Sequence, residues 1–312
     1  MERIVEEQQR PFDKKRRVVF VALPAHGNIH RETLKAALVY GATPRTDTVC
    51  QDRICSLLAY GFNSCWADFI NRPDLYDYFC LLHADVQPWV EMCMLGDLSE
   101  IPHEVRHLGG PGPWLDVMIE ELESDSYDVM HAVTAIKDER GVTSTGVGDI
   151  NEPHQWIRKI TTTELNRMPE TFGLDAVLEV FGNTGFKPDA KLCLMPNTGC
   201  LLIKQAPKWR KFPGFCMRDR LAVRMKDGFL VMPTFDQAQQ TDDELLDVPG
   251  DIVAVNIPED WNFGLWCARH RFKVGATRRV KTNHWGQSCY PSSYGWGQEH
   301  DSAFFHMMTK SN

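Results

Sequence analysis

The chain has 312 residues, of which 43% are hydrophobic and 24% charged, and its formal net charge is −8 at pH 7. These shares are ordinary for a folded domain and exclude an intrinsically disordered or low-complexity protein. The acidic balance disfavours a protein that binds nucleic acid through a broad basic surface, although it leaves room for a local basic patch.

Hydrophobic patterns predict strands and helices that alternate along the chain. The β-branched run at 18–24 is typical of a strand buried on both faces, and YFCLL at 78–82 predicts a second one, followed by a polar turn that Pro88 closes. In the first helix, Leu34, Ala37, Leu38 and Gly41 are expected to lie on one side. In chain order, we predict a strand at 18–24, helices at 31–42 and 52–71, a strand at 78–82, a helix at 114–123, a strand at 127–136, a strand or hairpin at 191–205, a helix at 260–272 and a strand at 274–286.

This alternation predicts one α/β unit with a less regular second half. Three stretches carry no confident long element. Residues 89–113 are rich in glycine and proline, residues 140–190 contain several turns, and residues 236–251 are acidic and polar, as in a surface loop.

The ten cysteines and the hydropathy profile bear on the compartment. No apolar run approaches the about 18 residues that a membrane-spanning helix needs, so we expect no membrane span. The chain begins with the polar MERIVEEQQR and its cysteines lack the CxxC pairs of a zinc knuckle. We therefore expect reduced, mostly buried thiols in a cytoplasmic protein, or in the host cytoplasm if the protein is viral.

Polar side chains of the kinds that bind ligands follow three apolar runs. Asp85 follows YFCLL, Glu259 and Asp260 follow VAVNIP, and His284 ends the last predicted strand. In open α/β sheets, ligands bind outside the carboxyl ends of the strands, which is where Asp85 and His284 are expected. One carboxylate and one imidazole suffice for Mg²⁺ or Mn²⁺ if phosphate oxygens and water complete the coordination. Glu259 and Asp260 open a helix, where the dipole favours carboxylates.

Each feature also has a plainer interpretation. His-x-Asp tripeptides such as 83–85 arise by chance, 258–260 can be a simple helix start, and His284 can be an ordinary core or surface histidine. Their joint occurrence, each at the end of an element, favours one shared site over three coincidences.

Seven stretches carry a resemblance to a known family. In order, they are VVFVALPAHGNIHRETLKAAL, SLLAYGFNSCWADFIN, FCLLHADVQP, PWLDVMIEEL with YDVMHAVTAIKD, NTGCLLI, PEDWNFGLWCARHRFKVGATRRV, and NHWG. Together they resemble GT-A-type glycosyltransferases, and within that group the family-2-like enzymes of bacteria, phages and large viruses. The resemblance implies an α/β fold of the GT-A type, with a Rossmann-like mixed sheet flanked by helices and an irregular acceptor-side half. It also implies a lead-in at 1–17, a GT-A-like catalytic domain at 18–286 and a tail at 287–312. Within the domain it implies a nucleotide-binding half at about 18–138 and an acceptor half at about 139–286.

The resemblance assigns metal and nucleotide contacts. HAD at 83–85 stands where the family has its DxD motif, which implies that Asp85 binds a divalent cation, Mn²⁺ or Mg²⁺, at the sugar-nucleotide diphosphate. His83 replaces the first Asp of that motif, and Ala84 lies between them in the nucleotide-sugar site. His284 in NHWG matches the late histidine that often completes the metal site.

Further roles follow from the same resemblance. PEDW matches the family's xED motif, which implies Asp260 as the general base and Glu259 as an acceptor or orienting contact. The nucleoside pocket is implied at Pro24 and Ala25, and at Asn63, where many relatives carry an Arg-Asn pair.

The implied function is transfer of a sugar from a nucleoside-diphosphate sugar, a UDP-sugar being favoured, to a hydroxyl of a glycan or another acceptor. Inversion with Asp260 as base is expected, although retaining enzymes share the fold. One alternative is a sugar nucleotidyltransferase, but its Gly-rich phosphate loop is missing because ALPAHGNIH has a single glycine. The other alternative is a non-catalytic binding protein, which the replacement at His83 favours. Nucleic acid is a disfavoured partner.

Other residues carry two interpretations each. Lys137 either contacts the donor or acceptor or ends a strand in solvent. Residues 197–199 either line the acceptor side or form a plain turn. Residues 89–113 form either a flap or a passive excursion. Four tryptophans form either a sugar-stacking platform or part of the core: Trp66, Trp114, Trp261 and Trp285.

Overall fold

A computed structural model describes residues 16–90, 112–151, 156–182, 189–215, 218–224, 230–231 and 250–297. Most of the predicted lead-in (1–15), most of the 89–113 insertion (91–111), the acidic stretch up to residue 249 and the tail from residue 298 lie outside the described residues.

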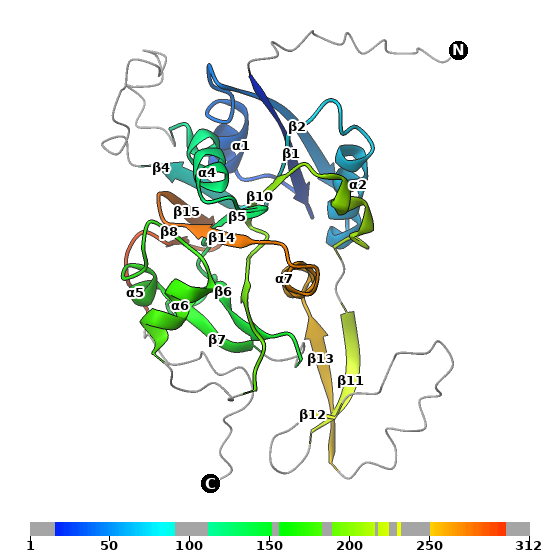
Figure 1. Cartoon of the computed structure of the whole chain (residues 1–312), viewed down its shortest axis with the longest axis vertical. Helices are drawn as coiled ribbons and strands as arrows, with labels where there is room; N and C mark the ends of the chain where they lie inside the picture. Colours follow the sequence, from blue (N-terminus) through cyan, green and yellow to red (C-terminus); the bar gives the residue numbers. More distant parts are fainter. Residues whose placement is uncertain are drawn as a thin grey trace.

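A seven-stranded mixed sheet lies at the centre of the described chain, with helices on both faces (Figure 1). Its strand order is β2-β1-β3-β10-β5-β14-β8. Five strands run parallel, while β10 and β8 run antiparallel to their neighbours. The strands are β1 (Arg17–Ala25), β2 (Thr46–Ile54), β3 (Tyr78–Leu82), β5 (Val129–Ala132), β8 (Thr171–Phe172), β10 (Cys200–Lys204) and β14 (Val274–Thr277). The predicted α/β class with a mixed sheet is confirmed, while the GT-A relationship stays a prediction.

Three smaller sheets surround the central one, in the orders β16-β15-β4, β7-β6-β9 and β12-β11-β13. Their strands are β4 (Val86–Val90), β6 (Val142–Asp149), β7 (Trp156–Thr161), β9 (Leu192–Met195), β11 (Arg218–Arg224), β12 (Leu230–Val231), β13 (Asp251–Ile257), β15 (Val280–Trp285) and β16 (Cys289–Pro291). The helices are α1 (Arg31–Leu38), α2 (Leu58–Ile70), α4 (Trp114–Ser124), α5 (Thr162–Leu165), α6 (Leu174–Phe181) and α7 (Glu259–Arg269), with a 3₁₀ helix at Pro207–Lys211. No helix in these described ranges is long and apolar enough to cross a membrane.

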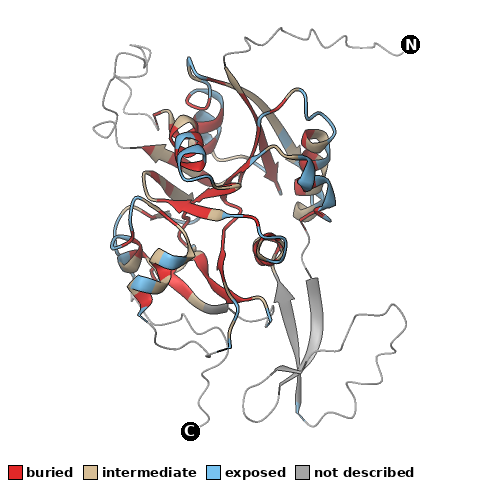
Figure 2. Ribbon diagram, viewed as in Figure 1, coloured by how far each residue is buried: buried red, intermediate tan, exposed pale blue. Residues whose placement is uncertain are grey.

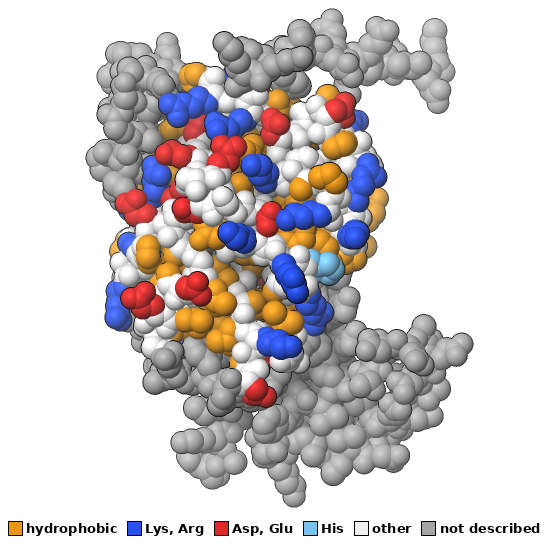
Figure 3. Space-filling view, in the orientation of Figure 1, with side chains coloured by type: hydrophobic (Ala, Val, Ile, Leu, Met, Phe, Trp, Pro, Cys, Tyr) orange, Lys and Arg blue, Asp and Glu red, His pale blue; other side chains and the backbone are white. Residues whose placement is uncertain are grey.

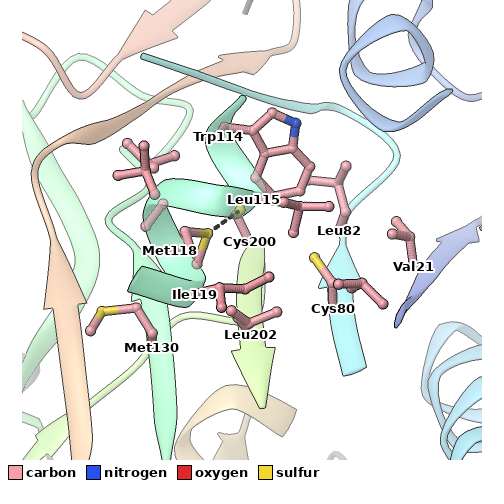
Figure 4. Close-up of a cluster of buried hydrophobic side chains, with 14 of the residues drawn as sticks. Val21, Cys80, Leu82, Trp114, Leu115, Met118, Ile119, Met130, Cys200 and Leu202 are labelled. Carbon is pink, nitrogen blue, oxygen red and sulfur yellow. Dashed lines mark hydrogen bonds between the residues drawn. The ribbon is translucent and has the colours of Figure 1, made fainter. Parts of the chain in front are cut away.

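The central sheet is buried on both faces (Figure 2). Successive residues of β1 point to opposite sides, so Val19 and Val21 pack toward α1 and α4, while Phe20 packs toward α2 and α7. Figure 4 shows the first of these clusters, in which α4 lies over β3 and β10. Burial on both faces explains why β1 and β3 read as continuous apolar runs, as predicted. The expectation that most cysteines are buried is confirmed within the described chain for Cys65, Cys80, Cys193, Cys200 and Cys267.

Helix α1 turns only part of the expected face inward. Leu34 and Leu38 are exposed, whereas Ala36 and Ala37 are fully buried. The buried side of α1 consists of Thr33, Ala36 and Ala37. The fully buried Trp114 of α4 is joined to it, because its indole Nε1–H donates to the Ala36 carbonyl at 2.9 Å. That carbonyl lies in the last turn of α1, where backbone oxygens lack helical partners.

Several predicted boundaries are wrong. The stretch 52–71 is not one helix, because β2 runs to Ile54 before α2 begins at Leu58. The turn predicted to close at Pro88 is instead strand β4, whose edge position in its sheet tolerates a proline. The 191–205 and 274–286 stretches each divide into two strands that belong to different sheets, β9 with β10 and β14 with β15. Residues 140–190 hold β6, β7, β8, α5 and α6.

The contrast between the buried β10 and the exposed face of α1 can be measured. Leu202 is fully buried and Leu38 is 55% exposed. We expect Leu202→Ala to lower the free energy of unfolding by about 2–5 kcal/mol, because it opens a cavity in the core. The matched Leu38→Ala should change it by less than about 0.5 kcal/mol. Urea denaturation of both variants checks this, and equal losses would contradict the placement of α1.

Candidate functional site

Several segments meet at the edge of the central sheet where the parallel strands end. HAD (83–85) follows β3, and the extension of β5 leads to Lys137. Because β10 runs antiparallel between β3 and β5, the turn 197–199 that precedes it lies at the same edge. The loop after β1 also reaches this edge, where His30 N–H donates to the Ala84 carbonyl at 2.7 Å. Loops gathered at the carboxyl ends of parallel strands are the usual place for a ligand site.

The carboxylate of Asp85 lies between two nitrogen groups from distant segments. Lys137 Nζ donates to Asp85 Oδ2 at 2.5 Å. His284 Nε2 lies 3.5 Å from Asp85 Oδ1. The structure therefore brings together Asp85 and His284, which the sequence placed at one site, and adds Lys137, for which the sequence left two interpretations open.

Strand pairing explains how His284 reaches Asp85. After β14 the chain leaves the central sheet, and β15 pairs antiparallel with β4 so that His284 lies opposite Val86, the residue next to Asp85. The backbone closes the arrangement, because Trp285 N–H donates to the Asp85 carbonyl at 2.8 Å. The Trp285 ring stacks on His30 with centroids 4.6 Å apart. The position of His284 is thus fixed by pairing with β4, a strand that the sequence analysis predicted as a turn.

The hydrogen bonds of His284 define which nitrogen is available. Its Nδ1 lies 2.7 Å from the Ala135 carbonyl, which only accepts, so Nδ1 carries the hydrogen. In the neutral ring, Nε2 then presents a lone pair toward the Asp85 carboxylate. Two lone pairs at this distance favour a cation between them, and one carboxylate with one imidazole suits Mn²⁺ or Mg²⁺. No group of three or more His, Cys, Asp or Glu side chains in the described part of the chain could hold a metal ion, so phosphate oxygens and water would have to complete the coordination.

Asp85 is ionised under all ordinary conditions. Burial acts to raise the pKa of its carboxyl group, but the His284 ring, when it is protonated and donates from Nε2, and the Lys137 ammonium outweigh burial and hold the pKa well below its usual range. An ionised carboxylate is the form that binds a cation.

His83 lies in a second network, apart from the Asp85 carboxylate. The Thr198 hydroxyl lies 3.1 Å from His83 Nε2 and donates to Glu259 Oε1 at 3.2 Å. Because the hydroxyl's one hydrogen goes to the carboxylate, His83 Nε2–H donates to the hydroxyl oxygen. Burial lowers the pKa of His83 against the opposing charges of Glu259 and Asp85, so the ring is neutral. Thr198 therefore links the HAD turn to the first residue of α7.

The turn before β10 is built around Asn197, a residue whose role the sequence left open. Its Nδ2 donates to the Ala132 carbonyl and lies 3.1 Å from Nδ1 of the fully buried His131, while its Oδ1 accepts from Gly199 N–H at 3.0 Å. A Cβ added at Gly199 would come within 3.1 Å of Asn197 Oδ1. The turn is a close-packed support that fixes Thr198 in place, rather than a plain hairpin loop.

Asp260 lies one residue after Glu259, in the first turn of α7. Burial and the neighbouring charge of Glu259 raise the pKa of Asp260 to about 8, against the opposing effects of the Trp261 N–H and Lys159. Burial also lowers the pKa of Lys159 to about 8, while the charge of Asp260 acts the other way. A carboxyl group with a pKa near neutral suits a group that takes up a proton.

The remaining predicted residues either end β1 at this edge of the sheet or make contacts elsewhere in the fold. Pro24 and Ala25 end β1 at the same edge of the sheet. Asn63 uses its amide on the backbone of Phe215, with both contacts at 2.6 Å. Three of the four tryptophans considered for a sugar platform are instead buried in the core, and the fourth stacks on His30. The three buried residues are Trp66, Trp114 and Trp261, and the residue that stacks on His30 is Trp285.

Comparisons with known proteins add little to this geometry. No family model matches the chain, and no curated protein matches it. Among solved structures, that of A197 from STIV is similar, with 14% identity, coverage of 93% of this chain and 98% of that chain, and a TM-score of 0.43. A likeness at that level carries no argument about this protein. The candidate site therefore stands on its own residues.

The Thr198 link can be tested without any ligand. Thr198→Val keeps the shape of the side chain but removes the hydroxyl, so His83 and Glu259 each lose a hydrogen-bond partner. We therefore expect the free energy of unfolding to fall by about 1–3 kcal/mol. Thr198→Ser keeps the hydroxyl and should recover most of that loss. Chemical denaturation of both variants gives the comparison, and equal stability of the Val and Ser variants would contradict the link.

Proposed function

We propose that this protein is a metal-dependent glycosyltransferase that uses a nucleoside-diphosphate sugar. The observation that carries the proposal is the pairing of Asp85 with Nε2 of His284, which lie 3.5 Å apart at the edge of the sheet where the parallel strands end. The resemblance of HAD, PEDW and NHWG to the family's motifs supports the same assignment, in the same chain order. UDP is the favoured nucleotide and a glycan hydroxyl the favoured acceptor.

In this proposal the donor's diphosphate lies beside Asp85 and His284. A divalent cation bound there would stabilise the charge that grows on the leaving diphosphate. The loop after β1 would contact the nucleoside, since its His30 N–H already holds the HAD turn through the Ala84 carbonyl. Exposed charges do not favour a nucleic-acid acceptor, because acidic and basic side chains are interspersed over the described part of one face (Figure 3).

Asp260 would act as the general base. The acceptor hydroxyl attacks the sugar's anomeric carbon while its proton passes to the Asp260 carboxylate, and the bond from that carbon to the diphosphate oxygen breaks. Glu259 cannot share this task freely, because it is buried and accepts the Thr198 hydroxyl. Its role is to orient the first turn of α7 and to raise the pKa of Asp260. Attack opposite the leaving group inverts the configuration at the anomeric carbon.

One observation favours a second candidate, a non-catalytic protein that binds a nucleotide or a sugar. His83, which replaces the first Asp of the motif, is an imidazole engaged with the Thr198 hydroxyl and supplies no carboxylate. The site then offers a single carboxylate for a cation. Metal-dependent hydrolysis of UDP-, GDP- or TDP-sugars separates the two candidates, since only the enzyme releases nucleoside diphosphate.

Metal dependence of nucleotide binding gives the first test. We expect Mn²⁺ to strengthen UDP binding at least about tenfold in calorimetry, since Asp85 and His284 would hold a cation that attracts the negative diphosphate. His284→Ala should abolish this gain while leaving metal-free binding of UDP unchanged. His270→Ala is a matched control, because His270 is exposed on α7. Equal affinity for UDP with and without metal would remove the cation from the proposal.

The pH dependence of transfer tests the base. Because Asp260 must be ionised to accept a proton and its pKa is raised to about 8, the transfer rate should rise with pH and level off above about 8. Asp260→Asn should keep donor binding and lose transfer by roughly 10²-fold or more. An undiminished rate would assign the base to another residue.

The same substitution has a readout that needs no substrate. A group whose pKa is raised on folding stabilises the protein fully only below its unfolded value, near pH 4, and that contribution is lost as pH rises toward about 8. Asp260→Asn should therefore melt at a higher temperature than the wild type at pH 8, and the difference should shrink toward pH 4. A difference that does not change with pH would show that Asp260 is not perturbed.

A further inference from the structure

Lys137 is the one member of the site cluster that the proposed function has not used. It lies after β5, and its ammonium donates to Asp85 Oδ2 at 2.5 Å. The side chains of Lys137 and Asp85 are 36% and 37% exposed, so a ligand from solution can reach both.

The path of the Lys137 side chain depends on a glycine. A Cβ added at Gly286 would come within 3.0 Å of Lys137 Cδ. Gly286 follows His284 and Trp285 in NHWG and therefore leaves room for the lysine stem to cross the turn toward Asp85. The ammonium is thus held at the cation site by the same segment that supplies His284.

A metal ion alone would leave the positive and negative charges at this site unbalanced. Lys137 occupies one oxygen of Asp85, and His284 faces the other. A divalent cation between Asp85 and His284 would lie beside the Lys137 ammonium and leave the site with excess positive charge, which opposes its binding. A diphosphate removes that excess, because its oxygens accept from the ammonium and coordinate the metal.

We propose that Lys137 is the anion-binding residue of the site: it pairs with Asp85 when the site is empty, and its ammonium moves to a phosphate oxygen of a diphosphate when a divalent cation binds beside Asp85. This inference rests on the proposed function for its choice of ligand. Lys137 then makes the two ligands interdependent, since it hinders the metal alone and supports the metal together with the diphosphate.

Two titrations on the full chain test this, with Mn²⁺ alone followed by electron paramagnetic resonance and with pyrophosphate in saturating Mn²⁺ followed by calorimetry. Lys137→Met should bind Mn²⁺ alone about tenfold more tightly, because a competing cation is gone, and bind pyrophosphate about tenfold more weakly. Lys137→Arg keeps the charge and should stay close to the wild type in both titrations.

Lys208→Met is the matched control. Lys208 forms the same kind of pair, 2.7 Å from Asp128 Oδ1, at the other end of β5. It should change neither affinity. Shifts of the same sign in both Lys137→Met titrations, or no shift in either, would overturn the role of Lys137.

The outcomes also separate this inference from the proposed function. If the wild type binds Mn²⁺ and pyrophosphate with the expected response to Lys137→Met but transfers no sugar and hydrolyses no sugar nucleotide, the enzyme proposal is wrong and the inference holds. If metal-dependent hydrolysis occurs while Lys137→Met leaves both affinities unchanged, the inference is wrong and the enzyme proposal holds. A wild type that binds neither ligand would overturn both.

Discussion

The candidate site depends on one ionised carboxylate, that of Asp85, just beyond the carboxyl end of the buried strand β3. A charge in this position is unfavourable unless other groups compensate for it. Lys137 and His284 provide that compensation, and they come from segments more than fifty and almost two hundred residues further along the chain. The extension of β5 and the departure of β15 from the central sheet both serve to bring these groups to Asp85.

A second constraint is the antiparallel strand β10 between β3 and β5. Because it runs against its neighbours, its preceding turn reaches the edge where they end, and Thr198 there joins His83 to Glu259. Helix α7 is thereby tied to the HAD turn through one hydroxyl group. In the proposed enzyme, this connection would keep the first turn of α7, and with it Asp260, in register with the donor's diphosphate.

The sequence predicted those parts of the fold that are set by local patterns. The runs of β1 and β3 are apolar because both faces of the central sheet are buried. Asp85 was found because it follows such a run, and His284 because it ends a predicted strand. Pairing between distant strands leaves weaker signals in the sequence. Because β4 contains Pro88, it was predicted as a turn, and because β15 follows β14 after only two residues, the two were predicted as one strand. The apolar pattern of α1 also misled in part, because its buried side consists of Thr33, Ala36 and Ala37 while Leu34 and Leu38 are exposed. The ion pair of Lys137 with Asp85 could not be predicted, since it depends on how two loops cross at the sheet edge.

The central claim is that a divalent cation binds between Asp85 and His284 together with a diphosphate. Anomalous diffraction from crystals grown with Mn²⁺ and UDP tests it most directly. The account predicts one manganese peak within bonding distance of an Asp85 oxygen, of His284 Nε2 and of the diphosphate. UDP bound at the sheet edge with no manganese between these two side chains, or manganese held at another place in the chain, would contradict the account.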